Sequence, residues 1–355
     1  MERTELLGMT QGEMEDFMAS AGEARFRGRQ VYRWVYVKNT GSFYDMSDLP
    51  RSLREKLDQL ARISIPKVVK ARTSNDGTRK FLLELSDKKR IETVAIPQKW
   101  EGGRKYTVCV STQAGCPIGC AFCATGQSGF DRDLTAGEIV GQVIVAEREM
   151  RRREKHTAED RIVTNLVFMG MGEPLLNLDA VLEAVALLND AKGMNLGQRH
   201  MTISTAGLVP GIDRLAEREL QLTLALSLHA VTDTVRNQLV PLNQKYGIRD
   251  VLAAVRRYTE KTGRRSTIEY VLLSGVNDRP EDADRLASLL KSMLVNVNLI
   301  PYNPVEGTGY DRPAPESVRC FLDRLTQAGI AATVREEMGN DIEAACGQLR
   351  ARRTT

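Results

Sequence analysis

The sequence of 355 residues lacks long apolar runs and has little net charge and few histidines. Its longest uncharged run, Tyr106–Phe130, is interrupted by glycine, proline and polar residues. No segment therefore offers the roughly 20 predominantly apolar residues of a membrane span. The amino-terminal Met-Glu-Arg-Thr-Glu carries charges of both signs, and no apolar signal core follows it. We expect a soluble, cytoplasmic protein with no membrane partner.

The net charge of +4 is too small to indicate a nucleic-acid partner by itself. The charge is unevenly distributed, however, because twelve basic residues stand against five acidic ones between Arg62 and Lys105. Such a segment fits a phosphate-binding surface, and it also fits an ordinary solvated sheet face. Charge alone favours the solvated face and leaves the phosphate-binding surface open.

Four of the six cysteines lie within fifteen residues, and the other two, Cys320 and Cys346, lie far downstream. Without a signal sequence, these thiols are expected in a reducing compartment, where structural disulfides are disfavoured. Metal binding or redox chemistry is the better expectation for this cluster.

The chain is predicted to have four parts. Residues 1–62 form a helical accessory domain that binds RNA, in which Thr10 and Glu13 make a helix-capping box. Residues 63–101 form an antiparallel β extension, because hydrophobic residues alternate there around two turns. Residues 102–335 form an α/β barrel, and residues 336–355 form a carboxyl-terminal tail.

The barrel prediction rests on a repeated alternation of strands and helices. Six strands are expected, at Tyr106–Ser111, Asn165–Met169, Met201–Ser204, Leu222–Leu228, Thr267–Leu272 and Val297–Pro301. The intervening helices include Thr135–Met150, Leu178–Leu188, Ile248–Thr259, Glu281–Met293 and Glu316–Ala328. The chain is too short for eight such units, so we expect a partial (βα)6 barrel. Polar or glycine-containing segments follow several strands and would form one functional rim.

The segment Cys116-Pro-Ile-Gly-Cys120-Ala-Phe-Cys123 supplies three soft ligands within eight residues. A structural zinc site usually has four protein ligands, and this loop contains no histidine. Three thiolates instead suit a four-iron cluster in which one iron remains open to a small molecule. Zinc is the less favoured alternative.

The spacing of Cys116, Cys120 and Cys123 before a predicted βα barrel resembles the radical S-adenosylmethionine (SAM) superfamily. Four further motifs are similar to the RlmN and Cfr family of RNA adenine methyltransferases: Cys109-Val-Ser-Thr-Gln-Ala-Gly-Cys116, Gly129-Phe-Asp-Arg-Asp-Leu134, Met169-Gly-Met-Gly-Glu-Pro174 and Asp341-Ile-Glu-Ala-Ala-Cys346-Gly-Gln-Leu. The resemblance covers nearly the whole chain. It implies a radical SAM barrel, a [4Fe-4S] cluster held by the three cysteines, and SAM.

The resemblance also implies an activity, which is methylation of adenine C2 in 23S rRNA and in some tRNAs, with two SAM molecules used per product. Cys346 matches the cysteine that carries the methyl group as S-methylcysteine. Cys109 matches its partner in a transient disulfide, and Glu92 matches the acceptor of the C2 proton. The matching SAM-binding positions are Gly172, Glu173, Ser204, Ser227, Leu228, His229 and Asn303.

From the residues alone, other roles stay open. Cys346 could be a buried helical cysteine, Cys109 a small apolar strand residue, Glu92 an outward-facing carboxylate and His229 a satisfied strand-end histidine. Two other functions also stay open, a Cfr-like C8 methyltransferase and a non-enzymatic, zinc-stabilised RNA-binding module. The family implies a reduced electron donor such as flavodoxin, and we expect a monomer.

Overall fold

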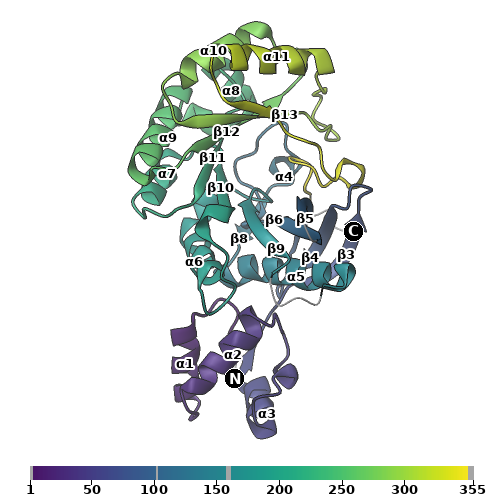
Figure 1. Cartoon of the computed structure of the whole chain (residues 1–355), viewed down its shortest axis with the longest axis vertical. Coiled ribbons are helices and arrows are strands. Elements are labelled where there is room, and N and C mark those ends of the chain that lie inside the picture. Colours follow the sequence, from purple (N-terminus) through teal and green to yellow (C-terminus); the bar gives the residue numbers. More distant parts are fainter. Residues whose placement is uncertain (1–2, 101–102, 157–160, 351–355) are drawn as a thin grey trace.

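A computed structural model describes residues 3–100, 103–156 and 161–350, and it centres on one sheet of ten strands. Seven consecutive strands of that sheet are parallel (Figure 1). In spatial order they are β6 (Gly103–Cys109), β9 (Val163–Phe168), β10 (Met201–Thr205), β11 (Thr223–Ser227), β12 (Ser266–Leu272), β13 (Val295–Pro301) and β14 (Ala332–Val334).

Helices cover the outer face of these strands (Figure 1). They are α5 (Ala136–Glu154), α6 (Leu178–Asn189), α7 (Val209–Ala216), α9 (Ile248–Thr262), α10 (Pro280–Leu290) and α11 (Pro315–Gln327). The short helix α8 (Asp233–Leu239) instead contacts the carboxyl ends of the strands, where its Arg236 binds the Ser227 carbonyl. All six predicted barrel strands are confirmed. The six strand–helix units are confirmed as well, because β14 adds a seventh parallel strand that no α-helix follows among the described residues. Its three residues are too few to give a periodic signal.

The antiparallel strands predicted before the barrel are also confirmed. They are β3 (Lys67–Thr73), β4 (Arg79–Glu84) and β5 (Arg90–Trp100), and they continue the barrel sheet rather than forming a separate layer. The junction is the antiparallel pairing of β5 with β6, in which Val94 lies opposite Cys109. Polar side chains on β4 and β5 are thereby brought near the carboxyl end of the first barrel strand.

The amino-terminal helices α1 (Gln11–Ser20), α2 (Phe26–Tyr36) and α3 (Arg51–Leu60) pack at one end of the molecule (Figure 1). The predicted capping box of Thr10 and Glu13 begins α1. The α1–α2 contact requires Gly28, because a Cβ there would lie 2.5 Å from the backbone nitrogen of Glu15. Buried Tyr32 donates a hydrogen bond to Asp190 at 2.6 Å, which joins the helices to the barrel.

The short elements complete the chain. They are β1 (Thr4–Glu5), β2 (Ala61–Arg62), β7 (Gln113–Gly115), α4 (Ala124–Gln127) and β8 (Phe130–Asp133), and the 3-10 turns are Phe43–Asp45, Pro174–Asn177, Gln198–His200, Pro241–Gln244 and Asn340–Ile342. Among the helices in the described ranges, none combines the length and apolar character needed to cross a membrane.

After β14 the chain returns across the open side of the barrel to the antiparallel strands (Figure 1). The backbone nitrogen of Gly339 donates to the Asp76 carboxylate at 2.6 Å, and the backbone nitrogen of Asn75 donates to Asp341 at 3.2 Å. The turn between β3 and β4 therefore anchors the start of the tail that carries Cys346.

Candidate active site

The three-cysteine loop lies between the paired strands β7 and β8. Its base is closed by a hydrogen bond from the Cys116 nitrogen to the Gly129 carbonyl at 2.8 Å. Gly115 has φ +84°, and a Cβ at this position would lie 2.1 Å from that carbonyl oxygen. Glycine is therefore required for the chain to enter the loop this closely. Burial raises the pKa of Cys116 to about 12 and that of Cys120 well above its usual value.

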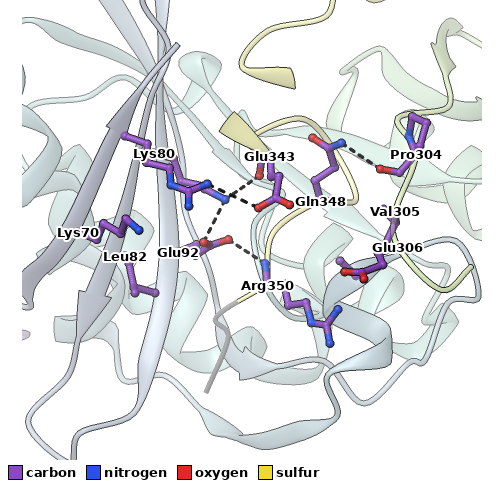
Figure 2. Close-up of a pocket in the computed structure, with 12 residues that line it drawn as sticks. Lys70, Lys80, Leu82, Glu92, Pro304, Val305, Glu306, Glu343, Gln348 and Arg350 are labelled. Atoms are coloured by element: carbon purple, nitrogen blue, oxygen red, sulfur yellow. Dashed lines mark hydrogen bonds and ion pairs between the residues drawn. The ribbon is translucent and has the colours of Figure 1, made fainter. Parts of the chain in front are cut away.

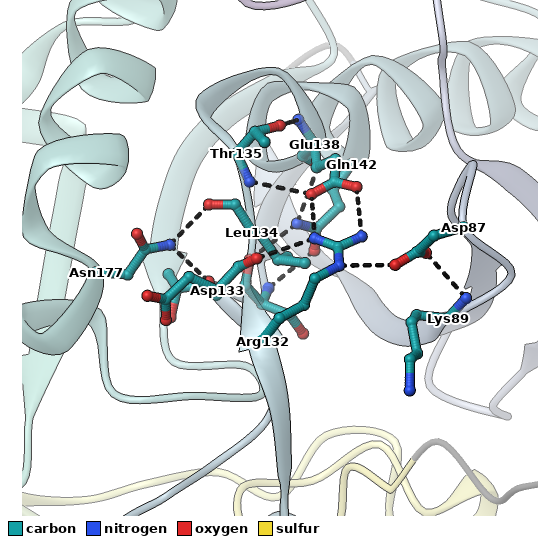
Figure 3. Close-up of polar contacts among 11 residues, drawn as sticks. Asp87, Lys89, Arg132, Asp133, Leu134, Thr135, Glu138, Gln142 and Asn177 are labelled. Atoms are coloured by element: carbon teal, nitrogen blue, oxygen red, sulfur yellow. Dashed lines mark hydrogen bonds and ion pairs between the residues drawn. The ribbon is translucent and has the colours of Figure 1, made fainter.

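Arg132 on β8 fixes the same hairpin to the rest of the barrel (Figure 3). Its guanidinium donates to both carboxylate oxygens of Glu138 at 2.8 Å and to Asp87 at 2.7 Å. Glu138 also completes the capping box that Thr135 begins at the start of α5. The hairpin is thus held between α5 and the turn that joins β4 to β5. The resemblance included this Arg132 segment, but the sequence alone did not indicate its structural role.

A cavity, here called the barrel cavity, is lined by the three cysteines and by residues at the carboxyl ends of the strands. Six of the seven predicted SAM-binding positions line it, namely Gly172, Glu173, Ser204, Ser227, His229 and Asn303. Leu228 is the exception, because its side chain is fully buried in the core. The main-chain nitrogen of Leu228 donates to Glu269, and its carbonyl accepts from Arg236.

Glu173 is a buried carboxylate whose oxygens accept hydrogen bonds from the backbone nitrogens of Ala206 at 2.7 Å and Leu175 at 3.1 Å. Burial raises the pKa of Glu173 to about 7. Glu173 therefore ties the turn after β9 to the turn after β10. Gly172 is required by packing, since its φ is +108° and a Cβ there would lie 2.7 Å from the Gln113 side chain.

His229 is held at the end of β11 by a hydrogen bond from the Val271 nitrogen to its Nδ1 at 3.0 Å. Burial and the nearby Arg236 lower the pKa of His229 to about 3, so the ring is neutral at physiological pH. With Nδ1 accepting, Nε2 carries the proton of the neutral ring. Asn303, after β13, has a buried Oδ1 that finds no hydrogen-bond partner among the described residues.

Arg236 was missed by sequence reasoning, yet it lies fully buried behind the cavity. Its guanidinium donates to the carbonyls of Leu228, Ala206 and Ser227 and to the side chain of Asn243, at 2.7–3.1 Å. Burial lowers the pKa of Arg236 to about 10, so it remains charged at neutral pH. It joins the turns after β10 and β11 and places a positive charge near Cys120.

Cys346 lies between the barrel cavity and an adjoining cavity that also contains Cys109. Arg335 lines both cavities. Burial raises the pKa of Cys346, and the positive charge of Arg335 lowers it. Burial likewise raises the pKa of Cys109 to about 12. All six cysteines are free thiols in this structure, so it does not support the disulfide between Cys109 and Cys346.

Glu92 lies in a third pocket, which is also lined by Glu343 and Arg350 of the tail (Figure 2). It is buried, and its carboxylate contacts Lys80 Nζ at 3.2 Å and the backbone nitrogen of Arg350 at 2.8 Å. The interpretation of Glu92 as an outward-facing carboxylate is therefore wrong. Burial raises its pKa, and Lys80 acts in the opposite direction.

The barrel cavity fits an iron–sulfur cluster and a polar organic ligand. Three thiols, the positive charge of Arg236 near Cys120, and the unpartnered Asn303 oxygen all belong to this region. Within the described ranges, no three His, Cys, Asp or Glu side chains converge to hold a single metal ion. A four-iron cluster does not require such convergence, because each cysteine can bind a different iron.

The fold and the three-cysteine loop together define a radical SAM protein. Residues 110–287 match the model of the Radical SAM superfamily. Residues 4–63 match that of the ribosomal RNA large subunit methyltransferase N-terminal domain.

Full-length relatives define the family more narrowly. The "Probable dual-specificity RNA methyltransferase RlmN" of Syntrophomonas wolfei is 52% identical over 99% of this chain and 98% of its own length. The "Dual-specificity RNA methyltransferase RlmN" of Marinobacter nauticus is 45% identical over 98% of this chain and 93% of its own. A crystal structure of a radical SAM methyltransferase from Sphaerobacter thermophilus matches with a TM-score of 0.92 and 44% identity, covering 98% of this chain and all of the other. The chain belongs to the RlmN family of radical SAM RNA methyltransferases.

Proposed function

We propose that this protein methylates C2 of adenine in 23S ribosomal RNA and in some transfer RNAs, with Cys346 as the methyl carrier. The observation that carries the proposal is the position of Cys346, whose thiol lies between the three-cysteine loop and the cavity of Cys109. The relatives named as dual-specificity RNA methyltransferases support both the RNA substrate and more than one class of RNA.

Cys116, Cys120 and Cys123 would hold a [4Fe-4S] cluster, and SAM would occupy the barrel cavity. Together these groups supply the radical chemistry that reaches an adenine carbon too poorly nucleophilic to attack a sulfonium methyl group directly. Among the chain's own groups, the Asn303 oxygen and the neutral His229 ring offer an acceptor and a donor for the polar parts of SAM. Ser204, whose hydroxyl donates to the Phe168 carbonyl at 2.7 Å, keeps its oxygen as an acceptor.

Glu92 and Cys109 would complete the transfer. Glu92 accepts the C2 proton of the base. Burial raises its pKa, and the nearby Lys80 favours the ionised form that a proton acceptor needs. Cys109 is the matching partner thiol for release of the product. This role is supported by the cavity that Cys109 and Cys346 both line, since no bond joins their sulfur atoms in this structure.

The RNA would approach along β3 and β4. Lys70 and Arg72 are exposed on β3 and line the pocket that contains Glu92. Figure 2 shows Lys70 in this position. Phosphate contacts from such side chains would supply affinity, and an unstacked adenine would supply specificity. In this proposal the amino-terminal helices bind RNA and the tail carries the methyl group. The domain boundaries are those proposed from the sequence, at residues 1–62, 63–101, 102–335 and 336–355. A flavodoxin-like electron donor, a monomer and a cytoplasmic location complete the proposal.

The test is product analysis after anaerobic reconstitution with iron and sulfide, followed by incubation with SAM, a reductant and 23S rRNA. Nuclease digestion and mass spectrometry should show 2-methyladenosine, and peptide analysis should show an added methyl group on Cys346. Cys320→Ala, at an exposed cysteine outside the cavities, is the matched control for Cys346→Ala. RNA that contains 8-methyladenosine and no 2-methyladenosine would refute C2 methylation. Unmodified Cys346 would refute the methyl-carrier role.

A further inference from the structure

A buried lysine lies at the contact between the antiparallel strands and the tail. Lys80 on β4 is only 7% exposed, and an isolated buried lysine is strongly unfavourable unless it is paired. Its partner is Glu92 on β5, which is 5% exposed and lies 3.2 Å from Lys80 Nζ. Leu82 is directly opposite Glu92 in the β4–β5 register, so Lys80 is the diagonal neighbour of Glu92 on the same face.

The Lys80–Glu92 pair also contacts the tail at two points (Figure 2). Lys80 Nζ donates to the Glu343 carbonyl at 2.8 Å, and Glu92 Oε2 accepts from the Arg350 nitrogen at 2.8 Å. These two contacts lie on either side of Cys346 in the sequence. The pair therefore fixes both ends of the short segment that carries the thiol.

The same segment also contacts α4, which follows the three-cysteine loop. The Ala124 nitrogen donates to the Gly347 carbonyl at 2.8 Å, and the Thr125 hydroxyl donates to the Leu349 carbonyl at 2.6 Å. The segment that carries Cys346 is thus held between α4, which follows Cys123, and the Lys80–Glu92 pair. Among the described residues, only the side chain of Lys80 contacts both the Glu92 carboxylate and the backbone of the tail.

We propose that Lys80 is a positioning residue for methyl transfer, which holds the Glu92 carboxylate and the tail of Cys346 in one arrangement. This inference rests on the proposed role of Glu92 as the proton acceptor. In that step the carbon radical formed from the Cys346 methyl group has already added to C2. The C2–H bond then breaks, its electron pair stays with the ring, and the proton passes to a Glu92 oxygen. A carboxylate has about four lone-pair sites, so Glu92 retains acceptor capacity after binding Lys80 and Arg350.

Lys80 also affects when Glu92 can accept a proton. Burial raises the pKa of Glu92, Glu343 on the tail raises it further, and Lys80 and the Arg350 backbone lower it. Lys70 and Arg72 of β3, Glu306 of the loop after β13 and the Arg350 side chain line the same pocket. Removal of the Lys80 charge therefore raises the pKa of Glu92, and a larger fraction of Glu92 is protonated at neutral pH.

The test compares Lys80→Met and Lys80→Arg with the matched control Lys261→Met, an exposed lysine in the last turn of α9. Methyl transfer is followed in single turnovers on RNA with hydrogen or deuterium at C2 of the target adenine. For Lys80→Met we expect a rate about tenfold lower at neutral pH, because Glu92 loses the cation that favours its ionised form and holds its carboxylate in place. The rate should recover toward alkaline pH, and the deuterium isotope effect should increase. Lys80→Arg should restore most of the rate, and Lys261→Met should match the unaltered protein.

Methylation of Cys346 by SAM, measured on the protein without RNA, separates positioning from folding. We expect Lys80→Met to methylate Cys346 normally, because the contacts of the segment with Ala124, Thr125 and Glu92 remain. An unchanged rate, isotope effect and pH profile in Lys80→Met would overturn the inference, and so would loss of Cys346 methylation in both Lys80 variants. Glu92→Gln tests the underlying function separately. Normal turnover by Glu92→Gln would refute the proton-acceptor role itself, whatever Lys80 does.

Discussion

Replacing Arg236 by Met tests whether one buried guanidinium holds the rim of the barrel cavity. Arg236 makes four hydrogen bonds at 2.7–3.1 Å and has no exposed surface. Each hydrogen bond to a charged group contributes about 1.5–3 kcal/mol, but the variant also escapes the cost of burying the charge. Three carbonyls and one amide oxygen lose this donor, so we expect the free energy of unfolding to fall by about 3–5 kcal/mol. This loss is a large part of the ~5–15 kcal/mol that stabilises a typical domain.

Equilibrium unfolding in urea, followed by circular dichroism, measures this change. The matched control is Arg257→Met on α9, because Arg257 makes two hydrogen bonds at 2.9 Å to Asp213 on the exposed surface. Such an exposed pair contributes about 0–1 kcal/mol. SAM affinity should also fall in Arg236→Met, because Ala206 and Ser227 line the barrel cavity. A loss below about 1 kcal/mol, equal to that of the control, would refute the reasoning.

Three further changes test other parts of the structure. Asn303→Ala should weaken SAM binding to the reconstituted protein about tenfold by equilibrium dialysis, because it removes the unpartnered buried oxygen. Unchanged affinity would contradict its proposed role. Gly28→Ala should lower the free energy of unfolding by about 1–3 kcal/mol, because the added Cβ would clash with the Glu15 backbone. An unchanged melting temperature would contradict this close packing. Lys70→Ala should reduce the slope of log affinity against log salt concentration by about one, which corresponds to the loss of one phosphate contact. An unchanged slope would exclude Lys70 from the interface.

The local patterns of the sequence predicted the fold well. Apolar strands and amphipathic helices repeat along the barrel. The pattern that identifies each strand or helix lies within its own short stretch of sequence, so it can be read without knowing the fold. The strand β14 was missed because it has three residues, of which two are exposed. The helix α8 was missed for a similar reason, since its seven residues include only two buried ones, Arg236 and Leu239. A buried arginine gives no sequence signal that distinguishes it from a surface residue.

The candidate site was predictable where its chemistry is local. The spacing of the three cysteines is contained within one loop, and the strand-end positions follow from the order of the barrel. The surroundings of Glu92 were not predictable, because Lys80 and Arg350 reach it from another strand and from the tail. For His229, the sequence left two roles open. The structure shows a ring that accepts a backbone hydrogen bond through Nδ1 and also lines the barrel cavity.

The anchoring of the tail has a consequence for protein synthesis. The contacts of Lys80 with Glu343 and of Glu92 with Arg350 join positions 263 and 258 residues apart. A ribosome therefore makes β4, β5 and the three-cysteine loop long before it makes the segment that carries Cys346. A chain interrupted in α11 would contain all three cysteines of the loop and lack Cys346, the proposed methyl carrier. On the proposed mechanism an unfinished chain cannot modify RNA, because the groups for methyl transfer come together only after the barrel is complete.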